Sequence, residues 1–163
     1  MEQALKYRKD LWSDFEDLMK QAGIGDCRLA INITEKRVRA RCASWPLPRV
    51  VELSKGAVDA GPSVWRPTLA HQAARTRQRR RWLIPFGAMA ITLVGAAMGA
   101  PAIGLACAGI WLLAAKWRYD LEADRWAAGA VGVETMARVL ERLGVTGRWR
   151  AGALRRRARH QLG

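Results

Sequence analysis

The apolar residues of the first 25 positions recur at helical spacing, three or four residues apart. Gly23 and Gly25 then end the pattern. The spacing predicts an amphipathic helix within 1–25. Its charged opening, MEQALKYRKDLWSDFEDLM, lacks the apolar stretch of a secretory signal, and we expect this end of the chain to stay in the cytoplasm.

The pattern changes to an alternation of period two in CRLAINITEKRVRARC, residues 27–42. With a turn centred on Thr34 and Glu35, it predicts an antiparallel hairpin that has one mostly apolar face and one basic face. Cys27 then lies opposite Cys42, either as two small buried hydrophobic residues in a reducing compartment or as a redox pair or metal site. RVVELS, residues 49–54, follows two prolines and predicts a third short strand.

The middle of the chain, residues 82–116, is predominantly apolar and has no charged residue before Lys116. As one helix its uncharged part would be about 50 Å long, more than a hydrocarbon core of about 30 Å needs, and Gly99-Ala100-Pro101 interrupts it. We therefore expect a transmembrane helical hairpin, with small residues such as Gly95 letting its arms approach. The alternative is a buried Gly/Ala-rich helical pair in a soluble protein.

Basic residues flank this segment on both sides, which places both termini in the cytoplasm by the positive-inside rule and the protein in the cytoplasmic membrane. The net charge of +14 also predicts attraction to polyanions. Anionic lipid is the expected partner, nucleic acid is an alternative, and a protein partner is a further expectation. The arginines expected to make these contacts precede the hairpin or lie in a basic tail, 145–163: Arg77, Arg79, Arg80, Arg81, Arg155, Arg156 and Arg157.

Two short motifs flank the apolar hairpin. His71-Gln72-Ala73-Ala74-Arg75 precedes it, and Asp120-Leu121-Glu122-Ala123-Asp124 follows it. In this order the chain resembles the HtpX and CAAX-prenyl-endopeptidase family of membrane zinc metallopeptidases, whose helices carry H-E-x-x-H and E-x-x-A-D.

The resemblance implies an α+β fold that consists of a small antiparallel sheet and the helices of a gluzincin-like metallopeptidase core. The transmembrane helical hairpin would be inserted into this core. Residues 26–81 would form the sheet and the first active-site-like helix. Residues 117–144 would form the second active-site-like helix and the helix that follows it.

The chemistry of the family is degenerate in this chain. His71 matches the first zinc ligand and Asp124 matches the family's aspartate. Gln72 stands at the position of the general base, where an amide cannot accept the proton of a zinc-bound water. Arg75 replaces the second ligand, and a guanidinium has no lone pair to give a metal. Asp120, one methylene shorter than the glutamate of the family, stands at the third.

We therefore expect a membrane-embedded, catalytically inactive metallopeptidase-like protein that acts by binding or regulation, without a cofactor. Arg75 and Asp120 are expected to form an ion pair that replaces the metal. One alternative is a small basic membrane protein that recruits nucleic acid or another acidic partner, in which His71 and Arg75 are ordinary polar residues. The other is an active zinc hydrolase with atypical ligands: His71, Asp120, and Glu122 or Asp124.

Overall fold

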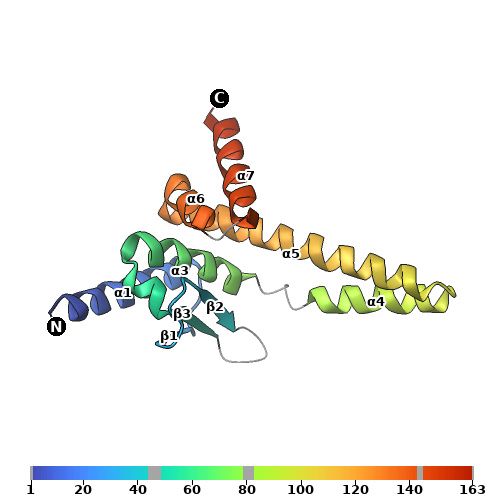
Figure 1. Ribbon diagram of the computed structural model, residues 1–163, viewed down its shortest axis with the longest axis horizontal. Helices are drawn as coiled ribbons and strands as arrows, with labels where there is room; N and C mark the ends of the chain where they lie inside the picture. The colour runs from blue at the N-terminus through green and yellow to red at the C-terminus, as the bar shows by residue number, and fades with distance from the viewer. Residues whose placement is uncertain (1, 44–48, 79–82, 143–144, 163) are drawn as a thin grey trace. The chain divides into compact units, whose positions relative to one another are not determined.

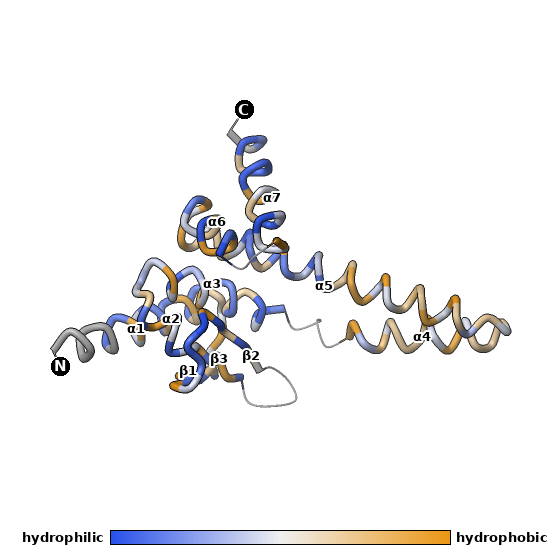
Figure 2. Tube along the Cα trace, in the orientation of Figure 1, coloured by the Kyte–Doolittle hydropathy of each residue, from blue (hydrophilic) through white to orange (hydrophobic). Residues whose placement is uncertain are grey.

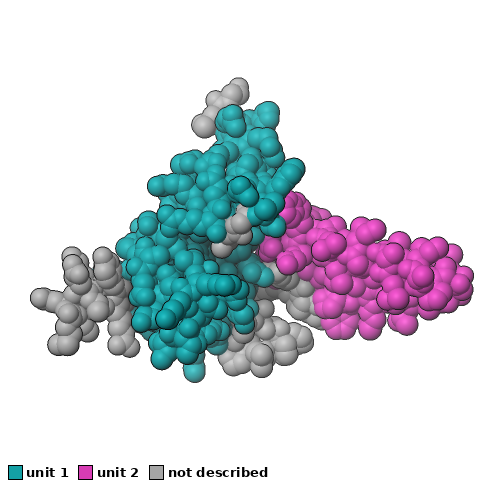
Figure 3. Space-filling model, viewed as in Figure 1, with its two compact units in different colours: residues 1–77, 122–163 teal, residues 78–121 magenta. Residues whose placement is uncertain are grey.

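The computed structural model describes residues 2–43, 49–78, 83–142 and 145–162 (Figure 1). They form seven helices and three strands in these ranges, so the expected α+β class is confirmed. The chain divides into two compact units, which Figure 3 colours separately. The first unit consists of residues 1–77 and 122–163, and the second consists of residues 78–121.

The first unit begins with α1, Glu2–Gln21, whose apolar side is buried. Gly23 follows the helix with φ +68°, a conformation that costs glycine least, and its amide donates to the Lys20 carbonyl. The core of the unit is formed by residues of α1, the sheet, α3 and the helices after residue 122, including Leu11, Phe15, Leu18, Val51, Leu53, Trp65, Leu69, Met136 and Leu140. The helix predicted for 1–25 is therefore confirmed.

The sheet is mixed, and its strand order is β1-β3-β2. β1, Arg28–Asn32, runs parallel to β3, Val50–Ser54, whereas β2, Ala40–Ala43, runs antiparallel to β3. The predicted third strand is thus present, but it is the central one. The expected hairpin of residues 27–42 is wrong, because β3 lies between its two arms, and so is the expectation of a purely antiparallel sheet.

The two cysteines expected to face each other belong to strands that do not pair. Cys42 lies opposite Val51 of β3, and Cys27 directly precedes β1 on the other side of that strand. Both are half-buried free thiols, and burial raises the pKa of the Cys27 thiol. The proposed pairing across a hairpin is therefore wrong.

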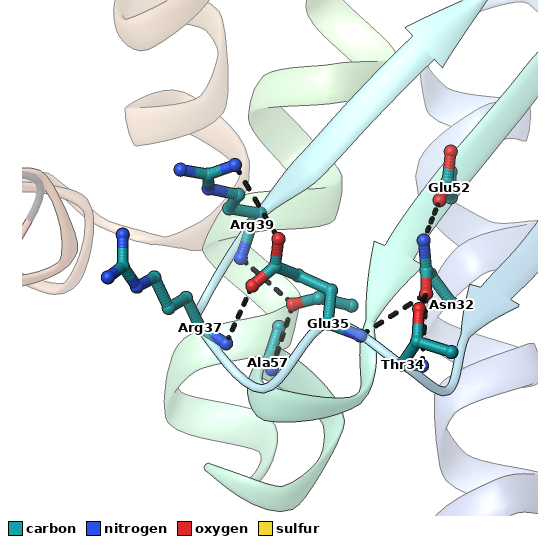
Figure 4. Close-up of polar contacts among 8 residues, drawn as sticks. Asn32, Thr34, Glu35, Arg37, Arg39, Glu52 and Ala57 are labelled. Carbon is teal, nitrogen blue, oxygen red and sulfur yellow. Dashed lines mark hydrogen bonds and ion pairs between the residues drawn. The ribbon is translucent and has the colours of Figure 1, made fainter.

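A network of polar contacts holds the connection between β1 and β2 against the start of α2, Lys55–Asp59 (Figure 4). The Oδ1 atom of Asn32 accepts hydrogen bonds from the backbone amides of Thr34 and Glu35, and its Nδ2 atom donates to Glu52 at 2.6 Å. Gly56 donates its amide to the Glu35 carbonyl, so the connection passes directly over the helix start. A Cβ atom at Gly56 would overlap the backbone of this connection. The residues after β1 therefore pass over the start of α2 and do not form a tight turn into β2.

α3, Pro62–Arg77, contacts β2 and β3 and also α1. Asp14 of α1 anchors the start of α3. Its carboxylate accepts a hydrogen bond from the indole of buried Trp65 at 3.1 Å and forms an ion pair with Arg66 at 3.2 Å. The helix that carries the first motif is therefore held by both the sheet and α1.

The second unit contains α4, Ile84–Ala97, and the first part of α5, Pro101–Val131. Gly99 adopts φ +71° between them, and the backbones approach so closely that a Cβ atom on Gly95 would lie 2.5 Å from the Cα atom of Gly104. The expected interruption at Gly99-Ala100-Pro101 is confirmed. Figure 2 shows that α4 and the adjoining part of α5 are the most continuously apolar part of the chain.

Within the described ranges, the structure contains no helix whose length and apolar character suffice to cross a membrane. α4 has 14 residues, about 21 Å of helix, and the apolar part of α5 ends at Lys116. The expected transmembrane hairpin is therefore wrong, and so is the placement of the protein in the cytoplasmic membrane.

Large apolar side chains of these two helices are instead exposed in the structure. They are Phe86, Met89, Leu93, Val94, Met98, Ile103, Leu105, Ile110, Trp111, Leu112, Leu113 and Trp117.

α5 continues without a break through the second motif, and Gly132, with φ +92°, separates it from α6, Val133–Arg142. The residues expected as a basic tail form another helix, α7, Val145–Leu162, which packs closely against α6. The tail expectation was wrong because the alternation of small apolar and arginine residues in this segment gives a helix with a buried side at Ala151 and Leu154.

Candidate functional site

His71 and Asp124, which the resemblance assigns to one site, are brought together in the first unit. His71 lies on α3 after two turns of helix that are buried at Trp65 and Leu69. Its Nδ1 atom lies 2.8 Å from the Oδ1 atom of Asp124 on α5. The two atoms are close enough for an ion pair, but the Nδ1 atom makes no hydrogen bond of good geometry, and Nε2 is the remaining ring nitrogen. A carboxylate lies beside a histidine in metal sites and also in buried polar clusters.

The sequence did not predict the third member of this cluster, Arg150 of α7. Its Nε atom donates to Oδ2 of Asp124 at 2.7 Å, and its Nη2 atom donates to Oδ1 at 2.6 Å. The two parallel bonds make the bidentate arrangement in which a guanidinium binds a carboxylate most strongly. The segment contains many arginines. Arg150 could have been distinguished from the others only by its place on the side of α7 that carries the buried residues Ala151 and Leu154.

The cluster of His71, Asp124 and Arg150 is almost closed to solvent. The side chain of Asp124 is 1% exposed, that of Arg150 is 11% exposed and that of His71 is 12% exposed. Burial alone would raise the pKa of Asp124, but the contact with His71 and the hydrogen bonds from Arg150 outweigh it and hold the pKa below its ordinary value of 3.8. Asp124 is therefore an anion that the protein neutralises internally.

Gln72, at the position of the general base, is 4% exposed and points toward the sheet. Its Nε2 atom lies 3.4 Å from the Ala40 carbonyl of β2, within reach of a long hydrogen bond. Neither this amide nitrogen nor the amide oxygen is basic enough to take a proton from water. The side chain thus links α3 to the edge of the sheet and offers no group for acid–base catalysis.

Arg75 and Asp120 were expected to form the pair that replaces the metal. Arg75 lies at the end of α3 in the first unit, and Asp120 lies in the part of α5 that belongs to the second unit. Asp120 is 9% exposed, Arg75 is half-buried, and each takes part in an interaction. The pairing of these two residues stays a prediction.

The donor set does not suit a zinc ion of the metallopeptidase type. Arg75 cannot ligate a metal, and Asp124 is engaged by both His71 and Arg150. Glu122, one of the atypical ligands considered, is exposed on α5. In the part of the chain that the structure describes, no three residues of the types His, Cys, Asp and Glu are grouped so that they could hold a metal ion.

The arginines expected to contact a polyanion have different surroundings. Arg77, Arg156 and Arg157 are exposed, whereas Arg155 forms ion pairs with Glu134 and Glu141 of α6. The residues 79–81 lie outside the described part of the chain. Arg155 therefore ties α7 to α6, and the exposed charge of α7 comes from its other arginines.

Comparison of the chain with protein-family models, with curated proteins and with solved structures finds no match. The likeness to zinc metallopeptidases therefore stands on the two motifs and on the contact between His71 and Asp124.

Proposed function

We propose that this protein is a catalytically inactive, metallopeptidase-like protein that acts by binding. The observation that carries the proposal is the bidentate contact between Asp124 and Arg150, beside His71. In a zinc site, the carboxylate that orients a ligand histidine strengthens it as a donor to the metal. Here a guanidinium from α7 uses the same carboxylate, and the charge of the cluster is balanced without a metal.

The residues next to His71 support the same conclusion. Hydrolysis by a zinc-bound water needs a carboxylate base beside the metal and an open coordination position. Gln72 stands where the base would be, and Arg75 stands where a zinc ligand would be. The amide cannot act as the base, and the guanidinium cannot bind the metal. Loss of the base alone removes a contribution of about two to four orders of magnitude in rate.

The exposed apolar side chains of α4 and α5 support a role in binding. Contiguous exposed surfaces of large apolar side chains are uncommon, and such surfaces mark sites of interaction. The segment 83–115 carries no charge.

The proposal is tested by restoring the motif and measuring bound zinc. Gln72→Glu, Arg75→His and Asp120→Glu together recreate the ligands and the base that the resemblance assigns. If the frame was inherited, the triple variant binds about one zinc ion per chain, measured by inductively coupled plasma mass spectrometry after dialysis, whereas the wild-type chain does not.

The matched control adds His71→Ala to the triple variant, and zinc must then be lost. A folded triple variant without zinc would show that the metallopeptidase frame is absent. Circular dichroism of each variant establishes that it is folded. Peptide hydrolysis by the wild-type chain would contradict the proposal that the protein is catalytically inactive.

A further inference from the structure

The solvent-facing side of α7 is strongly basic. The helix contains no aspartate or glutamate. Gly147, Ala151 and Leu154 are buried on one side, and the opposite side carries exposed basic and aromatic residues: Arg148, Trp149, Arg156, Arg159 and His160. Figure 2 shows α7 as predominantly hydrophilic.

The arginines of α7 fall into two groups. Arg150 and Arg155 are bound by carboxylates of α5 and α6. Arg148, Arg156, Arg157 and Arg159 are exposed, and in the described part of the chain none of the four forms an ion pair. The first group fixes the helix in the protein, so the second group is presented on a rigid support.

Arg148, Arg156 and Arg159 span 12 residues of helix, about 16 Å from the first to the last. One strand of a nucleic acid duplex has a phosphate about every 3.4 Å along its axis, so a surface of this length can follow several phosphates. A guanidinium matches a phosphate with two parallel hydrogen bonds. Spacing and chemistry therefore suit a polyphosphate backbone.

Trp149 distinguishes between kinds of polyphosphate. Its side chain is 67% exposed between the arginines and does not belong to the hydrophobic core of the described residues. An exposed indole beside arginines gives an unpaired base a ring on which to stack. A duplex keeps its bases stacked internally and cannot use this ring in the same way.

The same residues do not suit a lipid surface. A helix that lies in a membrane interface needs a broad apolar face turned toward the lipid. The apolar side of α7 at Ala151 and Leu154 is packed into the protein, and its exposed large apolar residues are Val145 and Trp149. Insertion would leave most of the exposed side, which is basic, in contact with the acyl region.

We propose that the exposed side of α7, formed by Arg148, Trp149, Arg156 and Arg159, binds single-stranded nucleic acid without sequence preference. The arginines contact the phosphates and Trp149 stacks on a base. This binding does not depend on the metallopeptidase-like cluster, which lies on the other side of the helix at Arg150.

The test is fluorescence anisotropy of a labelled twelve-nucleotide oligothymidine titrated with the full chain at several salt concentrations. Substitution of the three arginines by glutamine (Arg148→Gln, Arg156→Gln, Arg159→Gln) is expected to weaken binding and to reduce the slope of log K against log salt by about 2. Trp149→Ala is expected to weaken binding on the order of tenfold, and Trp149→Phe to restore most of it.

A second triple variant is the matched control: Arg28→Gln, Arg37→Gln and Arg125→Gln. It removes the same charge from exposed positions outside α7. Equal weakening by both triple variants would overturn the proposal, because the effect would then be one of net charge alone. Binding that Trp149→Ala leaves unchanged, or that is tighter to a duplex of the same length or to phosphatidylserine vesicles, would also overturn it.

Discussion

The carboxylate of Asp124 on α5 and the guanidinium of Arg150 on α7 form a buried bidentate pair, with Nε to Oδ2 at 2.7 Å and Nη2 to Oδ1 at 2.6 Å. His71 of α3 contacts the same carboxylate at 2.8 Å. One carboxylate therefore joins three helices that are separated by many residues in the sequence. The pair also sets the charge of the cluster, because the guanidinium compensates the buried carboxylate.

Substitution of either partner of this pair is expected to destabilise the protein. Arg150→Gln leaves Asp124 buried without its strongest donor, and Asp124→Asn leaves Arg150 without its counter-charge. Removing one partner of a buried pair costs about 3–5 kcal/mol. Urea unfolding at pH 7 measures the change in the free energy of unfolding. Arg148→Gln, on the exposed side of the same helix, is the control and should change it by less than about 0.5 kcal/mol.

The contribution of Asp124 should depend on pH in the acid range. Because its folded-state pKa lies below the ordinary value of 3.8, the native protein binds fewer protons there than the unfolded chain. The stabilisation is fully present above that ordinary value and is lost as pH falls through the lower, folded-state pKa. The difference in unfolding free energy between the wild-type chain and Asp124→Asn should therefore shrink from pH 7 to pH 2. A difference that stays constant over this range would show that the ionised carboxylate is not the stabilising species.

The contact between the two helices of the second unit should depend on the absence of a side chain at Gly95. A Cβ atom there would lie 2.5 Å from the Cα atom of Gly104, and the backbone cannot move aside as a flexible side chain would. Gly95→Ala is expected to destabilise the unit by about 1–3 kcal/mol, measured by thermal unfolding. Gly109→Ala, where a Cβ atom meets nothing within 4 Å, should be neutral or stabilising by up to about 1 kcal/mol.

The pair that the resemblance predicts between Arg75 and Asp120 is open to a double-mutant cycle. Arg75→Gln, Asp120→Asn and the double variant give the coupling energy from three unfolding experiments. A direct, partly buried pair predicts a coupling of about 1–3 kcal/mol. Additive effects within about 0.5 kcal/mol would show that the two side chains do not interact.

Local features of the fold could be predicted because their signals lie in neighbouring residues. The helical period before Gly23 and the β-branched residues of 49–54 each specify one element. The interruption at Gly99 and Pro101 follows from backbone preferences alone. The resemblance assigned His71 and Asp124 to one site without predicting a contact between them, and the structure brings the two side chains together.

The pairing of the strands could not be predicted in the same way. Alternation of period two shows which side chains share a face of the sheet, but it does not show which strand lies next to which. It therefore fits an antiparallel hairpin and a strand that pairs elsewhere equally well. One contact that such a pattern cannot show is the approach of Gly56 to the connection after β1, where its amide donates to the Glu35 carbonyl. The error about the cysteines followed from the error about the strands.

The apolar segment shows a different limit. The absence of charged residues from this segment suggested that it crosses a membrane. Whether a helix can cross a membrane also depends on its length. α4 ends after 14 residues, and α5 becomes polar from Lys116 onward. Arg150 was missed because its segment is rich in arginine, so that no pattern of charge alone could distinguish the buried one from the exposed ones.

The most direct test of the central claim is the zinc content of the wild-type protein, purified without chelators and dialysed against buffer with a slight excess of zinc. If Arg150 neutralises Asp124 in place of a metal site, mass spectrometry should find well under one zinc ion per chain, and His71→Ala should not change the value. About one zinc ion per chain that is lost in His71→Ala would contradict the account.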